Sequence, residues 1–164
     1  MTATRRILTI AAATLLSFAA ILFTKSSATA APTADDSDST SAALTKKAWA
    51  ALDAKHYDEV STLVAKCLEL HAAKAAEMQK SLKDFAPAGK EHDFWALNDC
   101  GTCQFILAKS HDAQGHKKEA IAAYTAVSDK FAYAQCWDPQ GWFWKPAEAS
   151  KDRIKELEPE GGAK

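Results

Sequence analysis

The chain has 164 residues, of which 48% are hydrophobic, and its formal net charge is −1. Such a balance offers no basic surplus to attract a phosphate backbone, which excludes nucleic acid as an expected partner. The sequence also contains neither a GxSxG nucleophile turn nor a GxxxxGK[ST] phosphate loop, so we expect no catalytic residues, no cofactor and no bound metal.

Residues 1–30 have the pattern of an export signal. Arg5 and Arg6 precede an uncharged run over residues 7–23, and the small residues Ala28-Thr29-Ala30 fit a signal-peptidase site. Cleavage after Ala30 would place the mature protein, with a charge of about −4, in the periplasm or cell envelope of a bacterium. If the run is not cleaved, its length is at the short limit of a spanning helix, and it would tether the protein to a membrane.

The rest of the chain divides into three parts. Residues 31–41, APTADDSDSTS, are acidic and lack large apolar side chains, which predicts a disordered leader. Residues 42–158 suffice for one compact domain, and residues 159–164 are expected to form a flexible tail.

Within the domain, apolar residues recur at steps of three and four, which predicts helices throughout and leaves almost no support for strands. The first helix carries Leu44 and Ala48 on one face. The second stripe runs from Tyr57 to Phe85 and ends at the breaker Ala86-Pro87-Ala88-Gly89. Further helices are expected over 93–113 and about 117–131, then an aromatic turn, and a last helix up to Leu157.

The sequence repeats weakly at an offset of 60 residues, which aligns 55–60 with 115–120. The second copy has small residues, a turn glycine and an aromatic at a characteristic spacing: Ala108, Gly115, Ala120 and Tyr124. In this spacing it resembles a tetratricopeptide repeat, although that family recurs at about 34 residues. The resemblance implies an all-α array of antiparallel helix hairpins, an α-α superhelix of about five helices with the last helix as its cap.

The resemblance also implies a function. In this family the first helix of each hairpin lines a concave face that binds a protein or peptide. We therefore expect a non-catalytic scaffold or adaptor of the cell envelope. The positions that would line the concave face are Lys46, Trp49, Phe105, Lys109 and Asp112.

The four cysteines are Cys67, Cys100, Cys103 and Cys136, an even number that predicts disulfides in an exported protein. In an antiparallel array Cys136 returns beside the CGTC motif at 100–103, which favours a bridge to either of its cysteines, with Cys67 bound to the other. Free buried thiols and a four-thiolate zinc site remain alternatives. A periplasmic thiol-disulfide oxidoreductase using Cys100 and Cys103 is the alternative function, but Asp99 would raise the thiol pKa there.

Trp137, Trp142 and Trp144 form an aromatic cluster within eight residues. They either present a platform for a ligand or close the open end of a short helical array, where bulky rings bury much apolar area. The first interpretation gives a second alternative function, a glycan-binding module.

Overall fold

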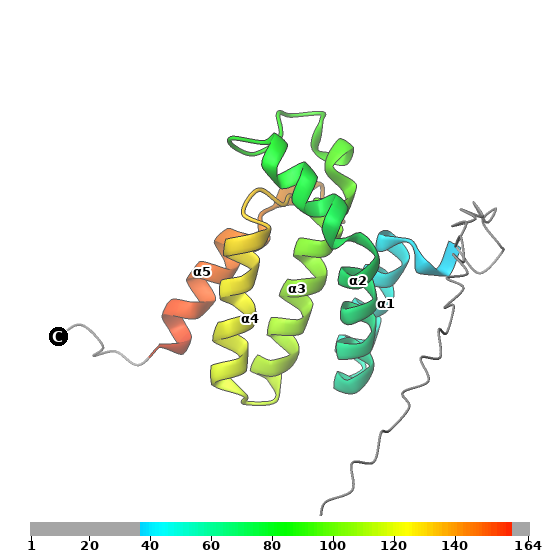
Figure 1. Ribbon diagram of the computed structural model, residues 1–164. Coiled ribbons are helices and arrows are strands. Elements are labelled where there is room, and N and C mark those ends of the chain that lie inside the picture. The colour runs from blue at the N-terminus through cyan, green and yellow to red at the C-terminus, as the bar shows by residue number, and fades with distance from the viewer. Residues whose placement is uncertain (1–36, 159–164) are drawn as a thin grey trace, which may run out of the picture. The chain divides into compact units, whose positions relative to one another are not determined.

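The computed structural model describes residues 37–158, which form five α-helices, two short 3-10 turns and one β-hairpin (Figure 1). The predicted export signal, residues 31–36 of the leader and the predicted tail at 159–164 lie outside the described residues. The helices are α1 (Ser41–Asp53), α2 (Tyr57–Ser81), α3 (Trp95–Ala113), α4 (Lys117–Lys130) and α5 (Pro146–Leu157). The all-α array predicted from the sequence is confirmed.

The first helix begins earlier than predicted, because the end of the leader is helical. A 3-10 turn spans Ser37–Ser39, and Thr40 caps α1 by accepting a hydrogen bond from the amide of Ala43 at 3.2 Å. Ser41 is buried, and its hydroxyl donates to the Asp99 carboxylate on α3. Residues 37–41 therefore belong to the helical domain.

Each helix packs on the next one in the chain, and α3 lies in the middle of the array. Besides its neighbours α2 and α4, α3 contacts α1 and α5. The helices α1, α3 and α5 thus form one side of the array, which we call the odd-helix side.

The turns that close the two hairpins, at 54–56 and 114–116, share their backbone geometry. Lys55 and Gly115 both have positive φ, at 60° and 74°. The amide of His56 donates to the carbonyl of Ala51 at 2.8 Å, and the amide of His116 donates to the carbonyl of His111 at 2.9 Å. These paired positions are the ones that the 60-residue offset aligns.

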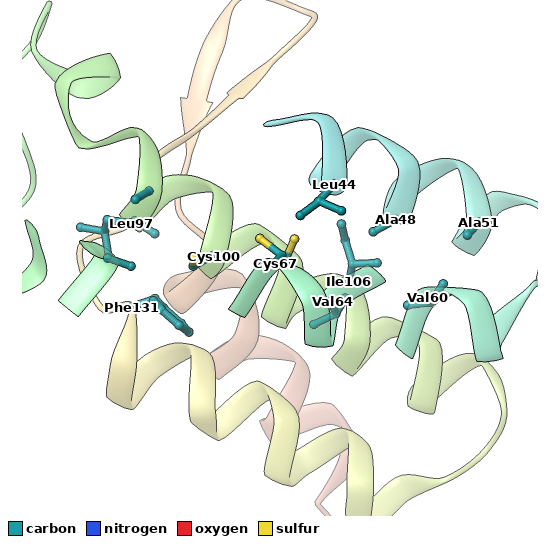
Figure 2. Packing of buried hydrophobic residues seen from close by; sticks show 14 residues of the cluster. Leu44, Ala48, Ala51, Val60, Val64, Cys67, Leu97, Cys100, Ile106 and Phe131 are labelled. Atoms are coloured by element: carbon teal, nitrogen blue, oxygen red, sulfur yellow. The ribbon is translucent and has the colours of Figure 1, made fainter. Parts of the chain in front are cut away.

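The core lies where α1 and α2 meet α3. Figure 2 shows Leu44 and Ala48 of α1 facing Val64 of α2, with Ile106 of α3 between them. A smaller cluster joins α3 to α4, where Ala108 and Ala120 are fully buried beside Tyr124. Small residues at these two positions let the helices approach closely, as the sequence predicted.

The structure also corrects the end of the second helix and the type of one element. The second helix ends at Ser81 instead of Phe85, because Leu82 adopts an extended backbone. The segment expected as an aromatic turn is an antiparallel hairpin of β1 (Cys136–Asp138) and β2 (Trp142–Trp144), with Cys136 paired to Trp144. Strands of three residues are too short for an alternating pattern to show in the sequence.

Candidate functional site

A pocket of about 490 Å³ opens between α1, the first half of α3 and the β-hairpin. We call it the aromatic pocket. Its apolar lining consists mainly of five aromatic side chains from four parts of the fold: Trp49, Trp95, Trp137, Phe143 and Trp144. Its polar lining includes Lys46, His92, Asn98, Asp99, Thr102 and Gln135.

Two of these tryptophans are unusually exposed for large apolar side chains. Trp95 is 45% exposed and Trp137 is 55% exposed. Trp137 packs edge to face on Phe143, with ring centroids 5.1 Å apart, and His92 packs on the same phenylalanine at 5.2 Å. Exposed aromatic rings that line one concave surface mark a binding site more often than an ordinary part of the surface.

Helical spacing brings the lining residues together. Thr45, Lys46 and Trp49 occupy neighbouring positions one turn apart on α1, and Trp95, Asn98 and Thr102 do so on α3. Both helices belong to the odd-helix side, so their lining faces meet across the pocket.

The β-hairpin, which forms the third side of the pocket after α1 and α3, is held on α3 by buried hydrogen bonds. The side-chain amide of Asn98 donates to the carbonyl of Glu91 at 2.7 Å and accepts from the amide of Gln135 at 2.9 Å. The hydroxyl of Thr102 lies 2.6 Å from the thiol of Cys136. Asn98 thus joins the turn before α3 to the segment that leads into the hairpin, and it fixes Trp137 over the pocket.

Asp99 is the acidic group of the pocket. Burial raises the pKa of this carboxyl, although the hydrogen bond from Ser41 and the nearby His71 oppose the rise. Of the two carboxylate oxygens of Asp99, only Oδ2 accepts a hydrogen bond from within residues 37–158, and its donor is the hydroxyl of Ser41. Gln135 is 9% exposed, and its Oε1 has no hydrogen-bond partner among the described residues.

The five residues predicted to line a concave face occupy two places on the odd-helix side. Lys46 and Trp49 line the aromatic pocket, together with Trp137 and Trp144 of the predicted aromatic cluster. The third member of that cluster, Trp142, is 49% exposed and does not line it.

The other three predicted residues, Phe105, Lys109 and Asp112, line a second, more open hollow between α3 and α5. Phe105 stacks edge to face on Trp144 at 5.1 Å and so adjoins the aromatic pocket. Asp112 is bound by both Nε and Nη2 of Arg153, at 2.6 and 3.0 Å, and this pairing lowers its pKa. No local pattern in the sequence indicates this partner of Asp112, because the docking of α5 on α3 is a tertiary contact.

The CGTC motif is part of the core. All four cysteines are buried free thiols, and Cys67 forms side-chain hydrogen bonds with Cys100 and Cys103. Cys136 instead contacts Thr102 and the carbonyl of Asn98. The bridges predicted from Cys136 to Cys100 or Cys103 are thus not formed in the structure, and the motif faces Cys67.

The surroundings of Cys67, Cys103 and Cys136 oppose ionisation of their thiols. The hydrogen bond with Cys100 is the main cause that raises the pKa of Cys67 to about 12, and burial raises the pKa of Cys136 to about 12. The pKa of Cys103 is raised as well, chiefly by its hydrogen bond with Cys67. A thiol must ionise to act as a nucleophile or a metal ligand. No group of three or more His, Cys, Asp or Glu side chains in residues 37–158 is placed to hold a metal ion.

Comparison of the chain with protein-family models, with curated proteins and with solved structures finds no match. The resemblance to the tetratricopeptide repeat therefore stays a prediction from sequence spacing. Among the helices of residues 37–158, none is both long enough and apolar enough to cross a membrane.

Proposed function

We propose that this protein is a non-catalytic scaffold that binds a peptide, or an extended segment of a protein, in the aromatic pocket. The export signal predicted for residues 1–30 supports a location of this activity in the periplasm or cell envelope of a bacterium. The tetratricopeptide-like spacing supports the same function, because that family binds peptides on the side to which α1 and α3 contribute here.

The observation that carries the proposal is the half-exposed tryptophan pair at the pocket. Trp95 and Trp137 leave much of their ring surface in solvent, although burying an aromatic ring is strongly favourable. A bound peptide would cover both rings. Rigid aromatic side chains around a concave surface are typical anchors of protein interfaces.

The alternative of a thiol oxidoreductase has weaker support. Cys100 and Cys103 have no exposed surface, and the raised pKa of Cys103 keeps that thiol protonated. A glycan-binding module is the second candidate function, because tryptophan rings beside polar groups also suit a sugar.

The test is a binding screen with a matched pair of variants. Random peptides and a set of oligosaccharides are offered to the purified protein, and selected ligands are titrated against Trp137→Ala and Trp142→Ala. Both residues are half-exposed tryptophans of the same hairpin, but only Trp137 lines the aromatic pocket. We expect peptides to be selected, with at least about tenfold weaker binding to Trp137→Ala, the effect of losing an interface anchor, and unchanged binding to Trp142→Ala.

Three results would contradict the proposal. The screen could return no peptide, the two variants could behave alike, or oligosaccharides alone could bind. The last result would favour the glycan-binding candidate, because its site would be the same pocket with a different ligand.

A further inference from the structure

The aromatic pocket contains hydrogen-bond acceptors that the described part of the chain does not fully use. Oδ1 of Asp99 accepts no hydrogen bond from residues 37–158, and Oε1 of Gln135 is buried without a partner. Leaving the buried acceptor of Gln135 without a donor is unfavourable, and the large majority of such groups in proteins are paired. Asp99 is only partly buried, so its Oδ1 is open to a donor that enters the pocket. A ligand that brings N–H donors into the pocket would pair with the free carboxylate oxygen of Asp99.

Resting on the peptide-binding function proposed above, we propose that the pocket receives a basic side chain of the peptide, a lysine or an arginine. Its ammonium or guanidinium group would lie against Asp99, and its aliphatic stem would pass between Trp95 and Trp137. The structure thereby assigns Asp99 as the specificity-determining residue of the site.

The surrounding rings favour a cation over an acidic or neutral side chain. The face of a tryptophan ring carries negative electrostatic potential and attracts a cation within about 6 Å. Five aromatic side chains line this pocket together with one carboxylate. An acidic side chain would meet repulsion from Asp99, and a neutral one would leave the carboxylate without a charged partner in a partly desolvated place.

A second charged side chain of the pocket allows the proposal to be tested by the direction in which substitutions change the affinity. Lys46, an exposed residue of α1, lines the pocket. It repels a cationic ligand and attracts an anionic one. Removing Lys46 and removing the charge of Asp99 must therefore shift the affinity in opposite directions, which loss of folding cannot imitate.

The experiment measures tryptophan fluorescence during titration with three matched pentapeptides. Each has two glycines on either side of a central arginine, citrulline or glutamate, with blocked ends. Citrulline has nearly the shape of arginine without its charge. We expect the arginine peptide to bind at least about tenfold more tightly than the citrulline peptide, since charge-assisted hydrogen bonds are about twice as strong as neutral ones.

The variants are Asp99→Asn and Lys46→Ala, with Glu69→Gln as a control on the exposed surface of α2. Asp99→Asn should weaken the arginine peptide about tenfold and leave the citrulline peptide unchanged. Lys46→Ala should strengthen the arginine peptide severalfold, and Glu69→Gln should have no effect. Asparagine can still accept the hydrogen bond from Ser41, and burial disfavours the charge it replaces, so this variant is expected to fold.

The outcomes separate the two proposals. If peptides bind but arginine and citrulline bind equally, or if glutamate binds best, the basic side chain is refuted and the peptide-binding function stands. If Asp99→Asn and Lys46→Ala shift affinity in the same direction, the assignment of Asp99 is wrong. If none of the three peptides binds and the broader screen also returns none, both proposals fail.

Discussion

Gly101, the second residue of the CGTC motif, is predicted to resist every side chain, even the methyl group of alanine. It lies inside α3, where glycine costs about 0.5–1 kcal/mol relative to alanine. A Cβ atom at this position would lie 2.7 Å from Cβ of Ala134 and 3.2 Å from Cβ of Phe131. Carbon atoms pack best at about 3.5–4.0 Å, and a Cβ atom cannot rotate away because it is bonded to the backbone.

The magnitude follows from two opposing effects. Inserting a methyl group into a packed core costs about 1–3 kcal/mol, and the better helix propensity of alanine returns up to about 1 kcal/mol. A contact of 2.7 Å belongs to the upper part of that cost, about 2–3 kcal/mol, so Gly101→Ala should lower the free energy of unfolding by about 1–2 kcal/mol. Because the displaced segment continues into Gln135 and Trp137, ligand binding in the aromatic pocket should weaken as well.

The assay is chemical denaturation followed by circular dichroism, carried out as a double-mutant cycle. Ala134→Gly removes the nearer Cβ atom. The double variant Gly101→Ala/Ala134→Gly should therefore lose less stability than the sum of the losses of the two single variants. If Gly101→Ala unfolds at the same or a higher denaturant concentration than the original protein, residues 131–134 do not approach α3 as the structure shows.

Three further predictions concern other parts of the array. Lys55→Gly should raise the free energy of unfolding by about 0.5–1 kcal/mol in thermal or chemical denaturation, because Lys55 has a φ of 60° that glycine adopts without strain; a loss of stability would contradict the turn geometry. Arg153→Met should cost about 0.5–1 kcal/mol at neutral pH, because this partly exposed pair is screened by solvent. The pKa of Asp112 is lowered, so its contribution to stability is present above the ordinary carboxyl pKa and is lost as pH falls through the lowered pKa. Denaturation at several pH values should therefore show the unfolding free energies of Arg153→Met and the original protein converging in acid, and a constant difference would refute the linkage. Mild oxidation should join Cys67 to a cysteine of the CGTC motif, raise the free energy of unfolding by about 3–4 kcal/mol and leave Cys136 as a thiol. Peptide mapping identifies the bridge, and a bridge to Cys136 would show that the contacts of Cys67 are wrong.

The sequence by itself determined the helices and the close contact of the second hairpin. Steps of three and four between apolar residues predict which face of each helix is buried, and Leu44, Val64 and Ile106 meet in the core accordingly. Ala108 and Ala120 were predicted from their spacing to lie where α3 and α4 touch, and both are fully buried. These features are local, since helix periodicity and side-chain size are readable over one or two turns.

Only the tertiary structure decided the role of the CGTC motif and the make-up of the site. From sequence, Cys100 and Cys103 suggested a redox pair, or one partner for Cys136 and one for Cys67, but the rotation of α3 turns both toward Cys67. The same rotation places Gly101 against Ala134, a contact across 33 positions of the chain that no local pattern reveals.

The aromatic pocket has the same origin. Lys46 and Trp49 were expected on a binding face, and Trp137 was noted as part of a separate cluster. Their meeting depends on the hydrogen bond that Asn98 accepts from the amide of Gln135, which holds the segment before the hairpin on α3, and on a hairpin too short to predict. Helix periodicity fixes which way a side chain points from its own axis, whereas a pocket between segments exists only once packing has fixed where those axes lie.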